Sequence, residues 1–212
     1  MVASSTTPRS AATGADDPAK EHTHPMTTWK IDTAHTQVNF SAKHMMVTNV
    51  RGTFHDVDGT IELDENDPTR SRGAFRVGAA SVDTNFVARD THLRSPDFFD
   101  AERFPSISFV ATEVEQVGDD HFNVTGDLTI RDVTKPIAFD VTLEGIVPGM
   151  SGARHAGLSA TATIVRADWD LNWNVALEQG GWLVGKEIKL DITIAADEVA
   201  VAESAELVAA RS

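Results

Sequence analysis

The side chains that could do chemistry in this sequence are its eight histidines and the charged residues near them, because the chain has no cysteine. The tightest group is Asp90, His92 and Arg94, three alternate residues that could supply an acid–base pair. A helix-capping and salt-bridge cluster is the favoured interpretation of the same residues, since exposed Asp, His and Arg commonly pair without catalysing anything. His44 is a second candidate acid or base. The remaining histidines show no metal-ligand spacing, so no metal site is predicted.

The absence of cysteine excludes disulfides, thiolate catalysis, zinc fingers and iron–sulfur clusters. The sequence also lacks a Gly-x-Ser-x-Gly elbow, a Walker loop, a Gly-x-Gly-x-x-Gly turn and a His-Glu-x-x-His pair. We therefore predict no catalytic residue and no tightly bound cofactor.

The net charge of the chain excludes two classes of binding partner. Lys and Arg number 18 against 32 Asp and Glu, a formal net charge of −14. Nucleic-acid binding and polybasic membrane anchoring both need an excess of cations, so neither is expected. The longest stretch without Asp, Glu, Lys or Arg is residues 155–165, far shorter than the roughly 20 apolar residues of a membrane-spanning helix. Stable membrane insertion is therefore not predicted.

In the segments that must position these side chains, apolar and polar residues alternate with a period of two. This alternation is typical of strands with one buried and one solvated face. The alternating segments are 38–42, 57–63, 75–79, 107–111, 122–130, 137–143, 158–164 and 188–194. Residues 85–104 do not alternate and predict one or two short helices with a break at Pro96. About eight antiparallel strands favour an all-β barrel, since closure removes exposed edges; a sandwich is the alternative.

The predicted inner face mixes aromatic and small side chains, such as Phe54 and Ala42. Small residues inside an eight-stranded barrel can leave room for one ligand. A filled core with no cavity is equally compatible with the pattern.

Composition divides the chain into three parts. Residues 1–26 are small, polar and proline-broken, so we expect a disordered tail; it includes His22 and His24, and Met26 is a candidate start. Residues 27–197 form the expected barrel domain, and residues 198–212 a loose C-terminal tail. Residues 1–28 hold no continuous apolar run of the kind a secretory signal needs, which makes a cytoplasmic protein the default expectation.

Several segments resemble the YceI-like family when read in order. They are WKID with Ala34 and His35, AKHMMVTNVRGTF (42–54), ASVDTNFVARDTHLRSPDFFDAERFPSISF (80–109), TGDLTIRDVTKPIAFDV (125–141), and ADWDLNWN followed by GGWLVGKEIKLDITI (167–194). The resemblance covers roughly residues 27–197, nearly all of the patterned region.

The resemblance implies a lipocalin-like extended antiparallel barrel with the 85–104 segment packed against it. It also implies a non-catalytic binding or carrier protein for a long isoprenoid-type lipid, such as a prenylated quinone, a polyprenol or a polyprenyl phosphate. Many members are secreted or periplasmic, and this chain departs from them by showing no signal. Two alternatives stay open: an enzyme using His92 or His44 on a bound lipid or quinone, and a structural or stress-response barrel without a ligand. A homodimer is also left open.

The predicted site combines an apolar lining with a polar end. The side chains expected to contact the ligand are Phe40, Phe75, Phe86, Phe98, Phe109, Phe139, Trp169 and Trp173. The candidates for a charged head group are Arg51, Arg89, His92 and Arg94, within a wider set that includes Lys43 and Arg131. Because the overall charge repels anions, the balance favours a neutral head group or an isoprenoid alcohol.

Overall fold

The computed structural model describes residues 26–149, 152–178 and 180–199. Nearly all of the predicted N-terminal tail, with His22 and His24, lies outside the described residues, as does the C-terminal segment from residue 200 onward. Glu198, which composition assigned to the C-terminal tail, is the last residue of a strand.

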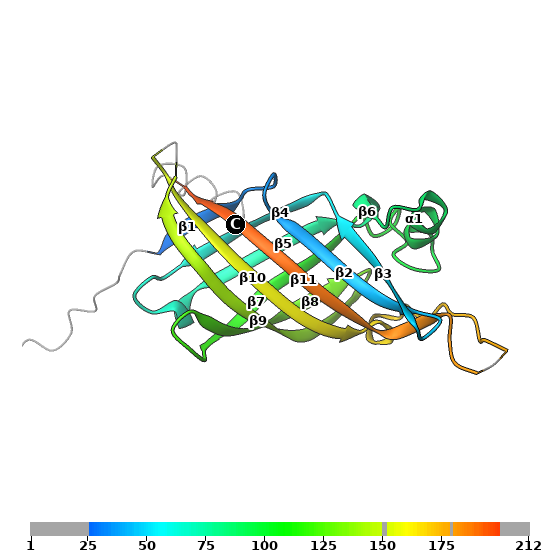
Figure 1. Cartoon of the computed structure of the whole chain (residues 1–212). Helices are drawn as coiled ribbons and strands as arrows, with labels where there is room; N and C mark the ends of the chain where they lie inside the picture. Colours follow the sequence, from blue (N-terminus) through cyan, green and yellow to red (C-terminus); the bar gives the residue numbers. More distant parts are fainter. Residues whose placement is uncertain (1–25, 150–151, 179, 200–212) are drawn as a thin grey trace, which may run out of the picture.

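The described residues contain eleven strands and one α-helix (Figure 1). The strands are β1 (Thr27–Ile31), β2 (Gln37–His44), β3 (Thr48–Phe54), β4 (Val57–Leu63), β5 (Arg72–Gly78), β6 (Val82–Asp83), β7 (Ser106–Gln116), β8 (His121–Ile130), β9 (Val133–Pro148), β10 (Arg154–Val165) and β11 (Val184–Glu198). The helix is α1 (Val87–Arg94), and short 3-10 turns occupy Pro68–Arg70, Ala79–Ser81 and Arg166–Trp169.

The strands close into an antiparallel barrel, which confirms the predicted fold class. In the described chain the closed ring runs β1-β4-β5-β7-β8-β9-β10-β11 and returns to β1, so it has eight strands. β11 is long enough to pair first with β2, where Gln37 faces Thr193, and then with β1, where Ile31 faces Ala196. β3 and β6 extend the sheet from β2, which lengthens the wall at the end where α1 lies (Figure 1).

The eight strands predicted from alternation correspond to β2, β4, β5 and β7 to β11, and they are not the same set as the eight of the ring. β1 is only five residues long and β6 only two, too short for a periodic signal. In β3 the alternation is interrupted by Gly52. A side chain there would stand 2.4 Å from Cζ of Phe40, so the glycine makes room for that ring.

One α-helix forms in the segment predicted to be helical, and it ends just before the proline. The backbone N–H of Ser95 donates to the carbonyl of His92, and Pro96 follows. The carboxylate of Asp90 is buried and accepts bonds from the N–H of Thr84 at 2.9 Å and its hydroxyl at 2.5 Å. Asp90 therefore anchors α1. No helix in the described part of the chain is long and apolar enough to cross a bilayer.

Two apolar clusters pack near opposite ends of the barrel interior. One contains Trp29, Ile31, Val57, Ala156 and Ala196, and the other contains Leu128, Ile130, Ile164, Trp169 and Leu171. Ala156 and Ile164 lie near the two ends of β10, so the clusters are separated by most of the length of that strand.

A charged cluster lies at the end of the barrel where β10 begins. The guanidinium of Arg154 donates to both oxygens of Glu198, at 2.7 and 2.9 Å, and to both oxygens of Glu65, at 2.9 and 2.7 Å. It also lies 5.3 Å from the ring centre of Trp29. Hydrogen bonding to Arg154 lowers the pKa of the Glu198 carboxyl below its ordinary value.

Replacing Arg154 with glutamine is expected to reduce the free energy of unfolding by about 1 kcal/mol at pH 7, because these charged bonds are partly screened by solvent. Glu198 has a lowered pKa in the folded state, so its contribution is present above the unfolded value of roughly 4.3 and is lost as pH falls through the folded value. Denaturant titrations at pH 7 and pH 3 should therefore show a difference that shrinks at low pH. A difference that is the same at both pH values would contradict this assignment.

Candidate functional site

The barrel interior contains a cavity of about 800 Å³. Its walls are almost wholly apolar and come from β1 to β5, β7 to β11 and α1. The lining extends from Trp29 and Leu63 at one end to Trp173 and Leu183 at the other. The interior is thus an elongated space between the two packed clusters, rather than a filled core.

Seven of the eight predicted ligand contacts line this cavity. They are Phe40, Phe75, Phe86, Phe98, Phe109, Phe139 and Trp173. Phe109 and Phe139 meet edge to face with ring centres 5.1 Å apart. The barrel therefore brings side chains from segments far apart in sequence around one cavity, and their contact with a ligand remains a prediction.

Trp169 has a different place. It is only 2% exposed, is not among the cavity-lining residues, and packs in the cluster of Leu128 and Leu171. Its indole N–H donates to the carbonyl of Leu128 at 3.0 Å. Trp169 thus packs in the core beside residues that line the cavity, whereas Trp173 lines the cavity itself.

The cavity reaches the surface beside α1. Phe86 lines the cavity and yet is 59% exposed. The ring of His92 stands edge-on to Phe98 at 5.0 Å and to Trp173 at 4.5 Å, and its Nε2 lies 2.9 Å from a carboxylate oxygen of Asp97. The helical segment therefore forms one side of a mouth, with His92 held between aromatic rings.

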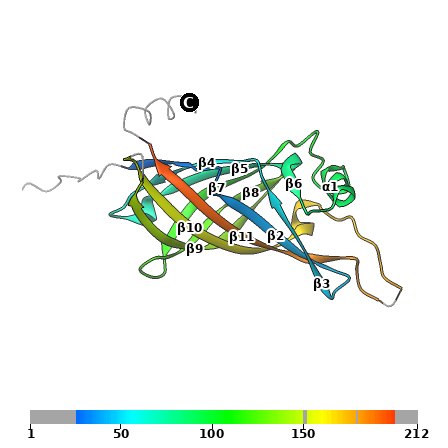
Figure 2. The same cartoon turned by 45° about the horizontal axis from the view of Figure 1, so that its top comes forward.

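Exposed apolar side chains gather at the same end. They are Met45, Met46 and Val47 between β2 and β3, Phe86 and Val87 at α1, and Val175 and Trp182 before β11. Both views show the β2–β3 turn, the segment before β11 and α1 at one end of the barrel (Figures 1 and 2). Met45 and Met46 have φ of 49° and 66°, a conformation that favours Asn and Gly. The mouth is therefore framed in part by apolar groups.

The predicted head-group residues are divided between the cavity and the outer surface. Arg89 and His92 line the cavity; the Arg89 guanidinium donates to the hydroxyl of Thr84 at 2.7 Å and to its carbonyl at 2.9 Å. Arg51 lines a separate polar groove on the outer wall. Arg94 donates to the carbonyls of Ala80 and Val82, both at 2.7 Å.

The wider set of cations is divided in the same way. Lys43 lines the cavity. Arg131 is not among the lining residues and lies 5.7 Å from the ring centre of Phe104. Arg89, His92 and Lys43 are thus the predicted head-group residues that border the interior.

One functional candidate was not predicted from the sequence. Arg166 lines the cavity, is only 6% exposed, and donates from Nε to the carbonyl of Gly185 at 3.0 Å and from a terminal nitrogen to that of Leu171. Burial lowers the pKa of its guanidinium because desolvation disfavours the charged form. The sequence contains one indication of this burial. Arg166 is an even number of residues from Ala160 and Ile164, so it falls on the same inward-facing side of the chain.

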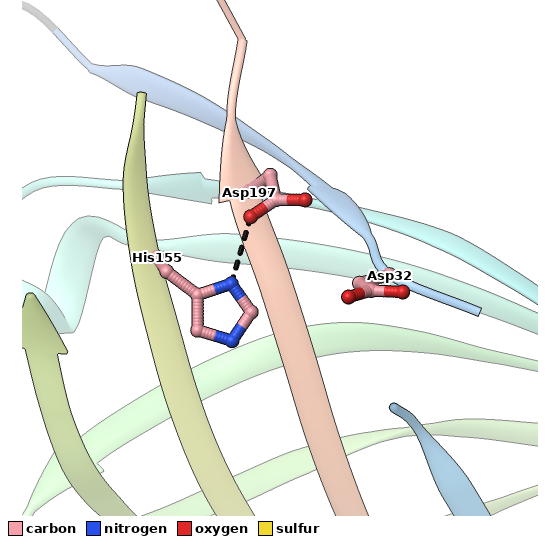
Figure 3. A group of neighbouring side chains, drawn as sticks. All are labelled: Asp32, His155 and Asp197. Carbon is pink, nitrogen blue, oxygen red and sulfur yellow. Dashed lines mark hydrogen bonds and ion pairs between the residues drawn. The ribbon is translucent and has the colours of Figure 1, made fainter. Parts of the chain in front are cut away.

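A second group of titratable side chains lies at the opposite end of the barrel. Ligand-type atoms of Asp32, His155 and Asp197 lie within 4.8 Å of one another (Figure 3). His155 Nδ1 is 2.7 Å from an Asp197 oxygen, and His35 Nδ1 is 2.6 Å from an Asp32 oxygen, which lowers the pKa of Asp32. Each carboxylate thus has its own histidine partner. These two pairs explain the cluster as a surface contact between the residue that follows β1 and the strands β10 and β11.

This architecture defines a class: a closed antiparallel barrel with a large apolar interior and one helix at its mouth. The family model of the YceI-like domain matches residues 29–196. The chain belongs to the YceI-like family.

The chain is also similar to individual known proteins and solved structures. A UPF0312 protein of Staphylococcus aureus (strain MSSA476) is 37% identical over 167 residues, covering 78% of this chain and 95% of that protein. The crystal structure of a Campylobacter jejuni YCEI protein is 31% identical with a TM-score of 0.65, covering 80% of this chain and 97% of the other. A polyisoprenoid binding domain from Saccharophagus degradans, implicated in plant cell wall breakdown, has a TM-score of 0.62 at 13% identity, covering 82% and 99%. At that identity only the fold is shared.

Proposed function

We propose that this protein is a non-catalytic binding or carrier protein that holds one long isoprenoid-type lipid inside its barrel. The observation that carries the proposal is the elongated apolar cavity of about 800 Å³. The described fold is shared with a protein whose name states polyisoprenoid binding, which supports the same ligand class. A prenylated quinone, a polyprenol and a polyprenyl phosphate all meet the requirement for a long apolar chain.

The chemistry of the walls favours hydrocarbon over water. A space of about 800 Å³ equals the volume of roughly 25 water molecules at ~30 Å³ each, and each buried water needs two to four polar partners. Phe, Val, Ile and Leu side chains cannot supply them. Transfer of hydrocarbon from water gains about 0.8 kcal/mol per CH₂, so several isoprene units would offset the cost of association.

The exposed apolar groups at the mouth support the carrier part of the proposal. A long hydrocarbon chain is stable in a bilayer or in the cavity but not in the water between them. Exposed apolar side chains at the mouth, Met46, Phe86 and Trp182, would shorten the distance over which the lipid chain contacts water as it moves between a bilayer and the cavity.

Organic extraction of the purified protein with lipid mass spectrometry tests the proposal. The expected result is a lipid with a long branched chain in the extract and a matching discrete added mass in the native mass spectrum. The same lipid, incubated with the protein, should be recovered chemically unchanged. A protein that carries no added mass and does not bind an added polyprenol would overturn the proposal.

Delipidated protein is expected to melt about 5–10 °C lower than the same protein reloaded with excess lipid. A ligand at 100 times its Kd stabilises the folded state by about 2.7 kcal/mol, and each kcal/mol shifts Tm by roughly 2–4 °C in a domain of this size. Differential scanning calorimetry at several lipid concentrations measures the shift. A Tm that does not depend on lipid concentration would be evidence against a ligand inside the barrel.

A further inference from the structure

Arg166 is a buried cation without a carboxylate partner. None of the ion pairs in the described part of the chain includes it, and its neighbours Asp168 and Asp170 are exposed. Its two protein hydrogen bonds go to the carbonyls of Leu171 and Gly185. Buried charges in proteins are normally paired, because desolvation of an isolated ion is costly. The structure therefore contains a positive charge for which the described residues supply no anion.

The cavity lining around Arg166 is also short of negative charge. The basic side chains on the same half of the cavity are Lys43, His44, Arg89 and His92. Among the described lining residues the one carboxylate is Glu65, which is hydrogen bonded to Arg154 at the opposite end. Arg72 and Arg76 of β5 also line the cavity, so its charged lining residues are mostly basic, and Lys43 and Arg89 lie on the same half as Arg166.

The unused hydrogen-bond donors of the Arg166 guanidinium also favour an anionic partner. A guanidinium has five N–H donors in a planar arrangement that matches the oxygens of a phosphate or a carboxylate. Arg166 uses Nε and one terminal nitrogen on backbone carbonyls, and its other terminal nitrogen donates to no described residue. An oxyanion at this position would satisfy the remaining donors and neutralise the charge together.

We infer that Arg166 binds the anionic head group of the enclosed lipid, so that the preferred ligand is a long isoprenoid-type chain ending in a phosphate or a carboxylate. This inference rests on the function proposed above and specifies its ligand. It reverses the preference for a neutral head group that net charge suggested. Surface charges are screened over about 8–10 Å at physiological salt, whereas a buried cation acts directly on a group beside it.

The test compares matched ligands on the full-length, delipidated protein. The probes are geranylgeraniol, its monophosphate and geranylgeranoic acid, which share one chain and differ only in the head group. Wild-type protein is expected to bind at least one of the two anions roughly 10- to 100-fold more tightly than the alcohol, the range expected for hydrogen bonds to a charged group. The ratio of the two anion affinities distinguishes phosphate from carboxylate recognition.

Arg166→Met removes the charge and keeps most of the side-chain volume. It is expected to bring the three affinities within about threefold of one another while leaving the affinity for the alcohol near that of wild type. Arg166→Lys should retain part of the preference. Arg103→Met, which removes an exposed cation paired with Asp100, is the matched control and should leave the preference unchanged.

The outcomes separate this inference from the proposal beneath it. Equal wild-type affinity for the alcohol and both anions overturns the anionic head group and leaves lipid binding intact. Failure of all three probes to bind overturns both. If Arg166→Met lowers Tm but keeps the wild-type ratio, Arg166 serves only to tether the carbonyls of Leu171 and Gly185. Should Arg166→Met not fold, the wild-type ratio and Arg166→Lys still decide the question.

Discussion

Replacing Ala160 with phenylalanine is expected to remove nearly all lipid from the purified protein while the barrel remains folded. Ala160 lines the cavity between Val141 of β9 and Ile192 of β11, so a phenyl ring there occupies the space of the ligand. In a packed core the same change would cost about 1–3 kcal/mol, because added atoms force their neighbours apart. Lipid mass spectrometry gives the occupancy, and thermal unfolding of the delipidated proteins gives the stability.

Ala79→Leu is the matched control. Ala79 is 1% exposed but is not among the cavity-lining residues. Its enlargement should cost the ~1–3 kcal/mol of overpacking and leave lipid occupancy unchanged. The cavity is refuted as a ligand site if Ala160→Phe shows the stability loss of the control and wild-type protein yields no lipid.

Trp169→Ala is expected to destabilise the protein by about 3–5 kcal/mol, the range for truncating a large buried aromatic side chain. The indole packs with Leu128 and Leu171, and its loss also removes the hydrogen bond from its N–H to the Leu128 carbonyl. Denaturant unfolding measures the change. The lipid affinity of the fraction that remains folded should be close to that of wild type, because Trp169 does not line the cavity.

Trp173→Ala should show the opposite pattern. Trp173 lines the cavity and contacts His92 and Phe98 at the mouth, so its removal is expected to weaken lipid binding with a smaller loss of stability. If Trp169→Ala abolished lipid binding at constant stability while Trp173→Ala did not affect it, the assignment of the two tryptophans would be reversed.

Alternation along the chain predicted the barrel well where strands are long and one face is wet. β8 is a clear example, since its buried residues, Phe122, Gly126, Leu128 and Ile130, all lie on one face. In β10 the buried residues Ala156, Ala160 and Ile164 also lie on one face, four residues apart. The pattern could not reveal β1, which is five residues long and closes the ring only through pairing with β11 at the far end of the sequence. Closure of the ring depends on pairing between strands that are far apart in sequence, so the periodicity of a single segment cannot predict it.

The site was predicted less completely because turns change which side a residue faces. Trp169 and Trp173 belong to one short sequence motif, yet a 3-10 turn and the left-handed conformation of Asp170 separate them into core and cavity. Arg166 was not predicted as a site residue, because alternation alone does not show that an arginine at the end of a strand is buried. Its burial follows from the next segment folding back over it, with the Leu171 carbonyl accepting its hydrogen bond.

The pairing of β1 with β11 has a consequence for how the protein folds. Trp29, near the start of the described chain, is the partner of Glu198, near its end. Contacts between residues so far apart in sequence carry a large loop-closure entropy, and all-β chains of high contact order fold in milliseconds to seconds rather than microseconds. β11 is the last of the described strands in chain order and completes the wall by pairing with β1, so the interior is enclosed only after β11 has been synthesised. A lipid can therefore be enclosed only by a chain that already includes both β1 and β11.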